Sequence, residues 1–280
     1  MSERTRNYRI TIQYEGSRYD GWQKQGNTDN TIQGRIEQIL GRMIGREVEI
    51  HGSGRTDAGV HAMGQVANFH LPGNRSPQEV MEYLNRYLPE DIAVLSCEPV
   101  SDRFHSRLNA SQKTYIYQIE VGQKRDVFAR RTRYGIAELL DVAAMKKAAE
   151  LLCGTYDYKS FCGNKKMKKS TIRTVYSIEV EQKKSNLIIL RFTGSGFLQN
   201  MVRIMTGTLI EVGQGRRSWD SMPEILAAMD RQAAGFTAPA EGLCLAEVRY
   251  ECINGTVRKH SERGSSYVDG FSAEKVCEKS

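Results

Sequence analysis

The sequence predicts an α+β fold made of two similar halves, each with an antiparallel sheet and crossing helices. Two observations carry this prediction. Short runs such as residues 8–14 and 114–121 alternate apolar and polar side chains, which is the period of a half-buried strand. Between such runs lie segments with apolar residues at helical spacing, and both features recur in the second part of the chain. The halves meet near residue 110, but the identity between them is too weak to define a repeat.

The first half opens with the strand at residues 8–14, which places Ile10, Ile12 and Tyr14 on one face. A helix follows from Ile32 to near Gly45. Asn30, with Gln33 three residues on, resembles a capping box for this helix. The remaining elements expected in this half are strands at 48–51, 65–70 and 92–96 and a helix at 77–87.

The second half begins with the strand at residues 114–121, which carries Tyr115 and Tyr117 on one face. The pattern then predicts a helix at 142–152, strands at 173–181 and 187–192, a helix at 197–212 and a closing strand at 243–250. The last helix has an apolar stripe that runs from Phe197 to Val212. We therefore divide the chain into an N-terminal half (1–110), a C-terminal half (111–250) and a mobile polar tail (251–280).

Composition narrows the class of protein. Forty Lys and Arg against 33 Asp and Glu leave a net charge of +7, which favours a polyanionic partner but is equally compatible with a soluble basic protein. No apolar run is long enough for a membrane span and the start lacks the apolar core of a signal peptide, so we expect no membrane partner and a cytoplasmic location. Six cysteines form no C-x-x-C pair and the five histidines do not cluster with them, so we expect reduced thiols and no metal.

The segment HGSGRTDAGVHA at residues 51–62 is the most unusual stretch of the chain. Its glycines permit tight turns around Arg55 and Asp57. Asp57 stands where a dinucleotide fingerprint needs its third glycine, and Val60 and His61 follow Gly59 where a phosphate loop needs Lys and Ser or Thr. The pattern instead suits a nucleophilic or acid–base Asp57 held ionised by a neighbouring guanidinium. The alternative is a turn aspartate that satisfies its own backbone.

This segment resembles the active-site motif of the TruA family of RNA pseudouridine synthases. Further resemblances follow in order along the chain from about Tyr8 to Tyr250. They are the loop GWQKQ at 21–25, the TIQ at 31–33, the LN, LP and DI pairs between 84 and 92, RFHSR at 103–107, K-x-Y-x-Y at 113–117, Phe161, RT at 173–174, FL-x-x-MVR at 197–203, GTL at 207–209 and TAPAEGL at 237–243. Ser106 replaces a small residue of the family pattern.

The resemblance implies two ferredoxin-like halves with antiparallel sheets joined around a central RNA-binding cleft. It also implies isomerisation of uridine to pseudouridine in tRNA without a cofactor, at uridines 38 to 40 of the anticodon stem-loop in bacterial members, by a homodimer. Asp57 would attack the target nucleotide or remove a sugar proton, and both routes stay open. The base must first leave its stack. Two alternatives are the same chemistry on ribosomal RNA and a non-catalytic RNA-binding paralogue, although an intact Asp57 favours catalysis.

The remaining site residues follow from the same reasoning. Tyr115 is the candidate aromatic platform for the flipped base, with Tyr117 either sharing that role or packing behind it. Arg203 interrupts an apolar stripe and is expected to pair with Asp57, while Arg55 is expected to orient the nucleotide. The residues expected to contact RNA are Arg18, Lys24, Arg103, His105, Arg107 and Lys113, together with the basic runs at 130–133 and 165–169.

Overall fold

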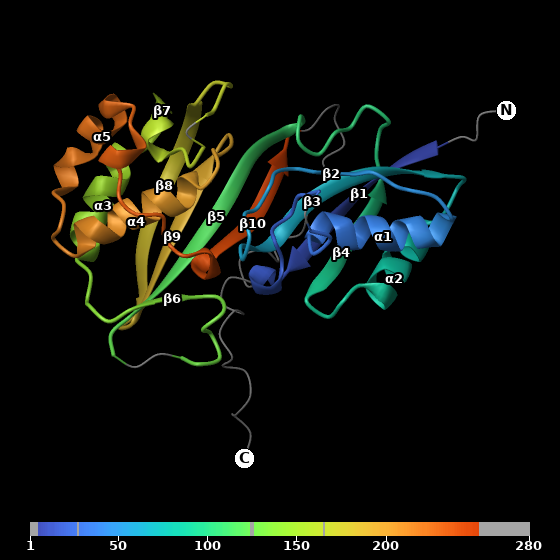
Figure 1. The fold of residues 1–280 in the computed structure, drawn as a ribbon, viewed down its shortest axis with the longest axis horizontal. Coiled ribbons are helices and arrows are strands. Elements are labelled where there is room, and N and C mark those ends of the chain that lie inside the picture. Colours follow the sequence, from blue (N-terminus) through green and yellow to red (C-terminus); the bar gives the residue numbers. More distant parts are fainter. Residues whose placement is uncertain (1–4, 27, 124–125, 165, 252–280) are drawn as a thin grey trace, which may run out of the picture.

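The computed structural model describes residues 5–26, 28–123, 126–164 and 166–251. Helices pack against one large sheet, which confirms the α+β class (Figure 1). The predicted division into two ferredoxin-like halves stays a prediction. The tail beyond Glu251 lies outside the described residues.

The elements mostly match the predicted ones. The α-helices are α1 (Ile32–Ile44), α2 (Pro77–Tyr87), α3 (Val142–Leu151), α4 (Met201–Gly213) and α5 (Met222–Ala228). The strands are β1 (Thr5–Tyr14), β2 (Ile50–Gly52), β3 (His61–Pro72), β4 (Ile92–Pro99), β5 (Ala110–Val121), β6 (Tyr134–Ile136), β7 (Gly154–Asp157), β8 (Ile172–Lys184), β9 (Leu187–Gly194) and β10 (Leu243–Tyr250). Short 3₁₀ turns, among them η1 (Gly16–Arg18) and η5 (Ala240–Gly242), connect some of them.

One sheet runs through both parts of the chain in the order β4-β1-β3-β10-β5-β9-β8-β7, with β2 paired to β3 and β6 paired to β5. Its central strand, β10, is the last strand in the described sequence. It pairs with β3 in parallel at Cys244 and Leu245 and with β5 in antiparallel, where Leu245 lies opposite Tyr115. Strand β10 therefore joins the strand that follows the Asp57 segment to the strand that carries Tyr115.

The helices cover the two ends of the sheet (Figure 1). Helices α1 and α2 lie by the β1–β4 end, and α3, α4 and α5 lie by the β8–β9 end. The alternating apolar side chains of β1 and β5, such as Ile10 and Tyr117, share a single hydrophobic core with these helices. A small separate cluster of Ile116, Leu187 and Ile189 forms elsewhere on the sheet.

Several elements differ from their predicted bounds, and some elements were not predicted. Strands β1, β3, β4, β5, β8 and β9 are longer than predicted, by up to four residues at one end. Helix α4 begins at Met201 rather than Phe197, because Asn200 at its N-cap adopts a left-handed backbone with φ 58°. Strand β2 begins at Ile50, two residues later than predicted. The short elements β6, β7 and α5 were absent from the prediction, since segments of three to seven residues carry too little periodicity to detect.

The predicted capping box is wrong. The N-cap of α1 is Thr31, whose extended backbone lets its side chain accept a hydrogen bond from the Gly34 N–H at 3.2 Å. The Asn30 side-chain amide instead donates to the Arg18 carbonyl, and the Gln33 amide oxygen accepts from the Lys24 N–H. The sequence offers neighbouring cap-forming residues, and only the backbone geometry selects between them.

Thr31→Ala is therefore expected to lower the free energy of unfolding by about 1 kcal/mol, because a helix N-terminal N–H loses its acceptor. Asn30→Ala is the comparison variant. It leaves the cap in place and removes only the exposed hydrogen bond to the Arg18 carbonyl, so it should cost less. Chemical denaturation of the two variants measures the difference. A loss for Asn30→Ala as large as that for Thr31→Ala would contradict the cap assignment.

Candidate active site

The loop between β2 and β3, residues 53–60, carries Asp57 and is fixed by backbone hydrogen bonds. Ser53 N–H donates to the Val66 carbonyl at 2.7 Å, Trp22 N–H to the Thr56 carbonyl at 3.1 Å, and Val60 N–H to the Asp57 carbonyl at 3.1 Å. Gly59 has φ 78°, a conformation that a side chain would strain. The turn is therefore rigid, and it holds the Asp57 side chain in one place.

Side chains of β1 and β3 form hydrogen bonds with the same loop. The Tyr14 and Thr56 hydroxyls are 2.8 Å apart in a buried hydrogen bond. The Gln65 amide donates to the Gly54 carbonyl at 3.0 Å, and its oxygen accepts from the Ser53 hydroxyl at 2.7 Å. Buried polar groups that are paired in this way specify a single loop conformation.

Asp57 pairs with Arg203 of α4, as predicted: the Arg203 Nη1 and the Asp57 Oδ2 are 3.8 Å apart. The Arg203 guanidinium is itself held by the Ala238 carbonyl at 2.7 Å and by the Asn200 Oδ1 at 3.0 Å. Arg55, the guanidinium next to Asp57 in the sequence, instead donates from Nε to the Gln23 amide oxygen at 3.1 Å and is exposed. The charge that faces Asp57 therefore comes from the other half of the chain.

Burial raises the pKa of Asp57 above its usual value, while Arg203 and the Asn200 backbone N–H act in the opposite direction. The side chain keeps 31 % of its surface exposed, so a substrate can reach it. A carboxylate with a raised pKa is both a better base and a better nucleophile than an ordinary aspartate.

Tyr115 of β5 lines the same cavity as Asp57 and is 8 % exposed. The Phe197 ring meets the Tyr115 ring edge-on with centroids 5.3 Å apart, which fixes the plane of the tyrosine. Burial raises the pKa of the Tyr115 hydroxyl, and the nearby Tyr14 and Asp57 add to the effect, so the phenol stays protonated. Tyr117 packs behind it: its ring is fully buried and its hydroxyl donates to the Pro239 carbonyl at 2.8 Å.

A cavity of about 440 Å³ opens between the Asp57 loop, β5, the segment from Asn164 to Arg173 and the start of α4. Among the described residues that line it, Asp57 supplies the one carboxylate. The six cationic residues in the lining are Arg55, Arg107, Lys113, Lys169, Arg173 and Arg203. This excess of positive charge selects a polyanionic ligand over a neutral or cationic one.

Of the residues predicted to contact RNA, Arg107 and Lys113 line this cavity. Arg18 and Lys24 do not; each lies near a carboxylate, Arg18 at 3.4 Å from Asp91 and Lys24 at 3.6 Å from Glu37. Arg103 and His105 also lie outside the lining, and the His105 ring stacks on His51 with centroids 5.0 Å apart. Their contact with RNA stays a prediction.

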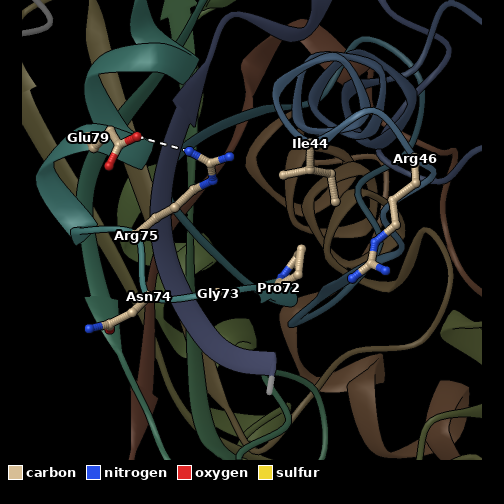
Figure 2. Close-up of a pocket in the computed structure, with 7 residues that line it drawn as sticks. All are labelled: Ile44, Arg46, Pro72, Gly73, Asn74, Arg75 and Glu79. Carbon is tan, nitrogen blue, oxygen red and sulfur yellow. Dashed lines mark hydrogen bonds and ion pairs between the residues drawn. The ribbon is translucent and has the colours of Figure 1, made fainter. Parts of the chain in front are cut away.

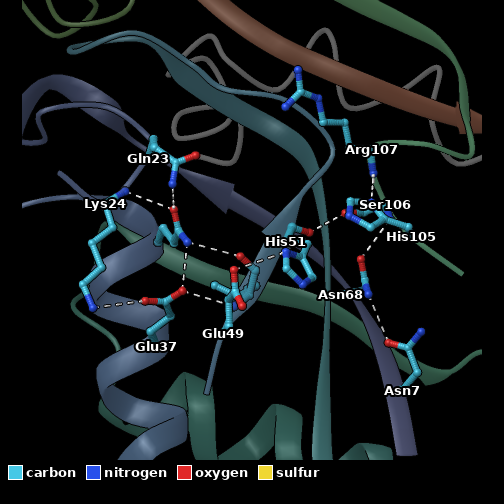
Figure 3. A network of polar contacts seen from close by, with 12 residues as sticks. Asn7, Gln23, Lys24, Glu37, Glu49, His51, Asn68, His105, Ser106 and Arg107 are labelled. Carbon is cyan, nitrogen blue, oxygen red and sulfur yellow. Dashed lines mark hydrogen bonds and ion pairs between the residues drawn. The ribbon is translucent and has the colours of Figure 1, made fainter. Parts of the chain in front are cut away.

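The segment from Arg103 to Arg107 is tied to the sheet by a polar network (Figure 3). The Asn68 Oδ1 accepts from the Ser106 N–H at 2.8 Å, its Nδ2 donates to the Asn7 Oδ1, and the Ser106 hydroxyl donates to the His51 carbonyl. The Arg107 side chain extends away from this network. The network therefore fixes the backbone that presents Arg107 to the cavity.

The two basic runs differ in their surroundings. Arg133 is not a surface cation: its side chain is 9 % exposed and lies 3.6 Å from Glu120 and 3.5 Å from Asp126. Arg130 and Arg131 are exposed. In the second run Met167 and Lys169 line the cavity, and Lys165 lies outside the described residues.

Sequence reasoning gave no chemical role to Arg173, Phe197 or Asn200. The family motifs contain Arg173 and Phe197, so their presence was visible but their contacts were not. Asn200 gave no signal, because its contribution depends on a left-handed backbone that presents its N–H to Asp57 and its Oδ1 to Arg203.

A second cavity, of about 460 Å³, lies away from these residues at the end of α1 and the start of α2 (Figure 2). It is lined by Ile44, Arg46, Pro72, Gly73, Asn74, Arg75 and Glu79. Arg75 and Glu79 form an ion pair at 3.0 Å across its edge. None of the predicted site residues contributes to it, and its carboxylate is already paired.

The described residues also show whether metal-binding clusters, free cysteines and helices that could span a membrane are present. Within the described ranges, no three His, Cys, Asp or Glu side chains are grouped to hold a metal ion. Cys97, Cys153, Cys162 and Cys244 are free thiols. Among the helices of the described chain, none is long and apolar enough to cross a bilayer.

An aspartate on a hydrogen-bonded loop, with a raised pKa and a cationic cavity around it, is suited to nucleophilic or acid–base chemistry on a polyanion. The fold and the site therefore indicate an enzyme of the class that acts on nucleic acid.

Comparison with known proteins specifies the class further. The family model described as tRNA pseudouridine synthase matches residues 10–109 and 148–251. The chain is 50% identical over 244 residues to a tRNA pseudouridine synthase A of Bacillus sp. (strain KSM-64), and 46% identical over 244 residues to a tRNA pseudouridine synthase A 2 of Bacillus anthracis. Each match covers 87% of this chain and 99% of the relative. A solved structure, of a Cbf5-Nop10-Gar1 complex, is similar only slightly, at 14% identity and a TM-score of 0.33 over 72% of this chain and 45% of that one.

The chain belongs to the family of tRNA pseudouridine synthases, the TruA family. The resemblance seen in the sequence is thereby confirmed, and the protein is an RNA pseudouridine synthase of the isomerase class.

Proposed function

We propose that the chain isomerises uridine to pseudouridine at positions 38 to 40 of the anticodon stem-loop of tRNA, with Asp57 as the reacting carboxylate. The observation that carries the proposal is the placement of Asp57 with Arg203 and Tyr115 at one cationic cavity. The volume of about 440 Å³ is in the range of pockets that enclose small ligands, and a flipped nucleotide is of that size.

The net reaction exchanges the bond from the sugar to N1 for a bond from the sugar to carbon 5, and a proton is lost from carbon 5 and gained at N1. The ionised Asp57 either attacks the target nucleotide or removes a sugar proton, and the bond between N1 of uracil and the sugar breaks. The uracil turns and rejoins the sugar through carbon 5, and in the same stage Asp57 leaves its adduct or the sugar regains its proton. Carbon 5 loses its proton to a base or solvent, and N1 takes up a proton, so that the product has the same atoms as the substrate. Arg203 favours the ionised form of Asp57 against the effect of burial, and the Tyr115 ring supplies an aromatic face for the detached base.

Two further features belong to the proposal. The protein is expected to act as a homodimer that grips one tRNA across two chains, as the family resemblance implies, and to work in the cytoplasm. It is expected to need no cofactor, as the family resemblance also implies.

The test is site-mapped pseudouridine formation on unmodified tRNA, by carbodiimide labelling and primer extension. Stops confined to the anticodon stem-loop support the proposal. Stops on ribosomal RNA but not on tRNA would favour the alternative substrate. RNA binding with no stops on either would favour a non-catalytic RNA-binding protein.

A further inference from the structure

Three cations line one wall of the active-site cavity: Lys113 of β5, Arg107 just before β5, and Arg173 of β8. They are electrostatic neighbours, since Arg107 and Arg173 both act on Lys113, and Arg107 acts on Arg173. Within the part of the chain that the structure describes, none of the three forms an ion pair with a carboxylate. The described lining around them contains no acid other than Asp57, which faces Arg203.

The hydrogen bonds of Lys113 and Arg173 go to backbone carbonyls instead. The Lys113 ammonium donates to the Ser53 carbonyl at 2.8 Å, and the Arg173 guanidinium donates to the carbonyls of Ser170 at 3.0 Å and Ile172 at 2.6 Å. A carbonyl dipole orients a cation but does not neutralise it. Elsewhere the fold does neutralise a buried cation, as the pairing of Arg133 with Glu120 shows.

This arrangement disfavours the charged form of Lys113 in the free protein. Like charges in a partly desolvated site repel one another. Burial, followed by the charges of Arg107 and Arg173, lowers the pKa of Lys113 to about 8. An anion placed among the three cations would relieve the repulsion and supply the missing counter-charge.

We propose that Lys113, Arg107 and Arg173 form a binding site for one phosphodiester group of the RNA strand next to the reacting uridine. The identification of the anion as RNA phosphate rests on the proposed function. The site adjoins the Asp57 loop, because Lys113 is bonded to Ser53 at the start of that loop. A Cβ on Gly54 would lie 2.8 Å from the Lys113 Nζ, so glycine leaves room for the ammonium there. Phosphate bound at this point fixes the strand relative to Asp57.

The proposal is tested with a series of anticodon stem-loop RNAs, each carrying one neutral methylphosphonate in place of a single phosphate near the reacting uridine. For wild type, one position in the series should weaken binding by about tenfold, the effect expected for a charge-assisted hydrogen bond. For Lys113→Gln the same replacement should cost clearly less than for wild type, because one of the three cationic partners of the phosphate is already gone. Lys146→Gln, the same change on the exposed surface of α3, should behave as wild type.

A second experiment measures RNA affinity as a function of pH. Wild-type affinity for the unmodified stem-loop should fall as pH rises through about 8, where the free Lys113 ammonium loses its proton. Bound phosphate stabilises the ammonium, so the fall should end at a higher pH, above the pKa of Lys113 in the complex. Lys113→Arg should remove this dependence while retaining affinity, because the guanidinium stays charged.

The proposal would be overturned if each methylphosphonate lowered the RNA affinity of Lys113→Gln by the same factor as that of wild type. A pH dependence of affinity that persists in Lys113→Arg would also overturn it. Displacement of the RNA by low millimolar inorganic phosphate would overturn the assignment to an RNA phosphodiester, because the three cations would then form a generic anion site. A failure of the phosphate site can be distinguished from a failure of the proposed function. Wild type that forms no pseudouridine while the position-specific loss is still observed would refute the isomerase activity on this RNA and leave the phosphate site standing.

Discussion

Asp57→Asn is expected to abolish pseudouridine formation, with a loss of at least ~10⁴-fold in the single-turnover rate. The amide has the shape of the carboxylate, but it neither attacks carbon nor accepts a proton at neutral pH. RNA affinity should stay within severalfold of wild type, because the phosphate contacts belong to other residues. Single-turnover assays with mapped stem-loop RNA, together with a binding titration, measure both quantities.

The same variant tests the physical state of Asp57. Its folded-state pKa is raised above the ordinary value, so ionising it near neutral pH costs stability, and this cost appears as pH rises through the raised pKa. Asp57→Asn should therefore unfold at the same temperature as wild type or at a higher one. Turnover close to wild type would rule out Asp57 as the reacting group, and a large fall in unfolding temperature would show that the loss of activity reflects misfolding.

Arg203→Met is expected to lower the single-turnover rate by about 10²- to 10³-fold, the range for removal of one preorganised charged group in an active site. Arg203 opposes the effect of burial on the pKa of Asp57. Without the guanidinium the Asp57 pKa should rise further, so a rate that depends on ionised Asp57 should begin to fall at a higher pH as the solution is acidified. The pH–rate profile measures this shift, which loss of packing alone would not produce.

Arg55→Met is the matched control, because Arg55 is adjacent in sequence but donates to Gln23 rather than facing Asp57. It is expected to weaken substrate binding. The acid limb of the profile, the fall in rate on acidification, should stay at the same pH as in wild type. An equal shift of the acid limb in both variants would contradict the assignment of Arg203 as the partner of Asp57.

Much of the fold followed from local patterns. The alternation at residues 114–121 predicted β5, and the spacing from Ile32 predicted α1, because strand and helix periods are visible over a few residues. Errors arose where several residues could serve the same local role. Asn30 and Thr31 are both good caps, and Phe197 continues an apolar stripe that the backbone of Asn200 interrupts.

The sequence by itself determined the α+β class, the placement of Asp57 on a glycine-bounded turn and, through its ordered motifs, the family. These features depend on residues close together in the chain or on patterns read in order. The sequence also led to the expectation that Arg203 pairs with Asp57, but the tertiary structure decided the geometry of that pair, the part that Asn200 plays in it and the place of Arg173 beside Lys113. The order of strands in the sheet brings β10 between β3 and β5, and the packing sets α4 opposite the Asp57 loop. Distances between groups far apart in the sequence depend on this packing, and no local pattern records them.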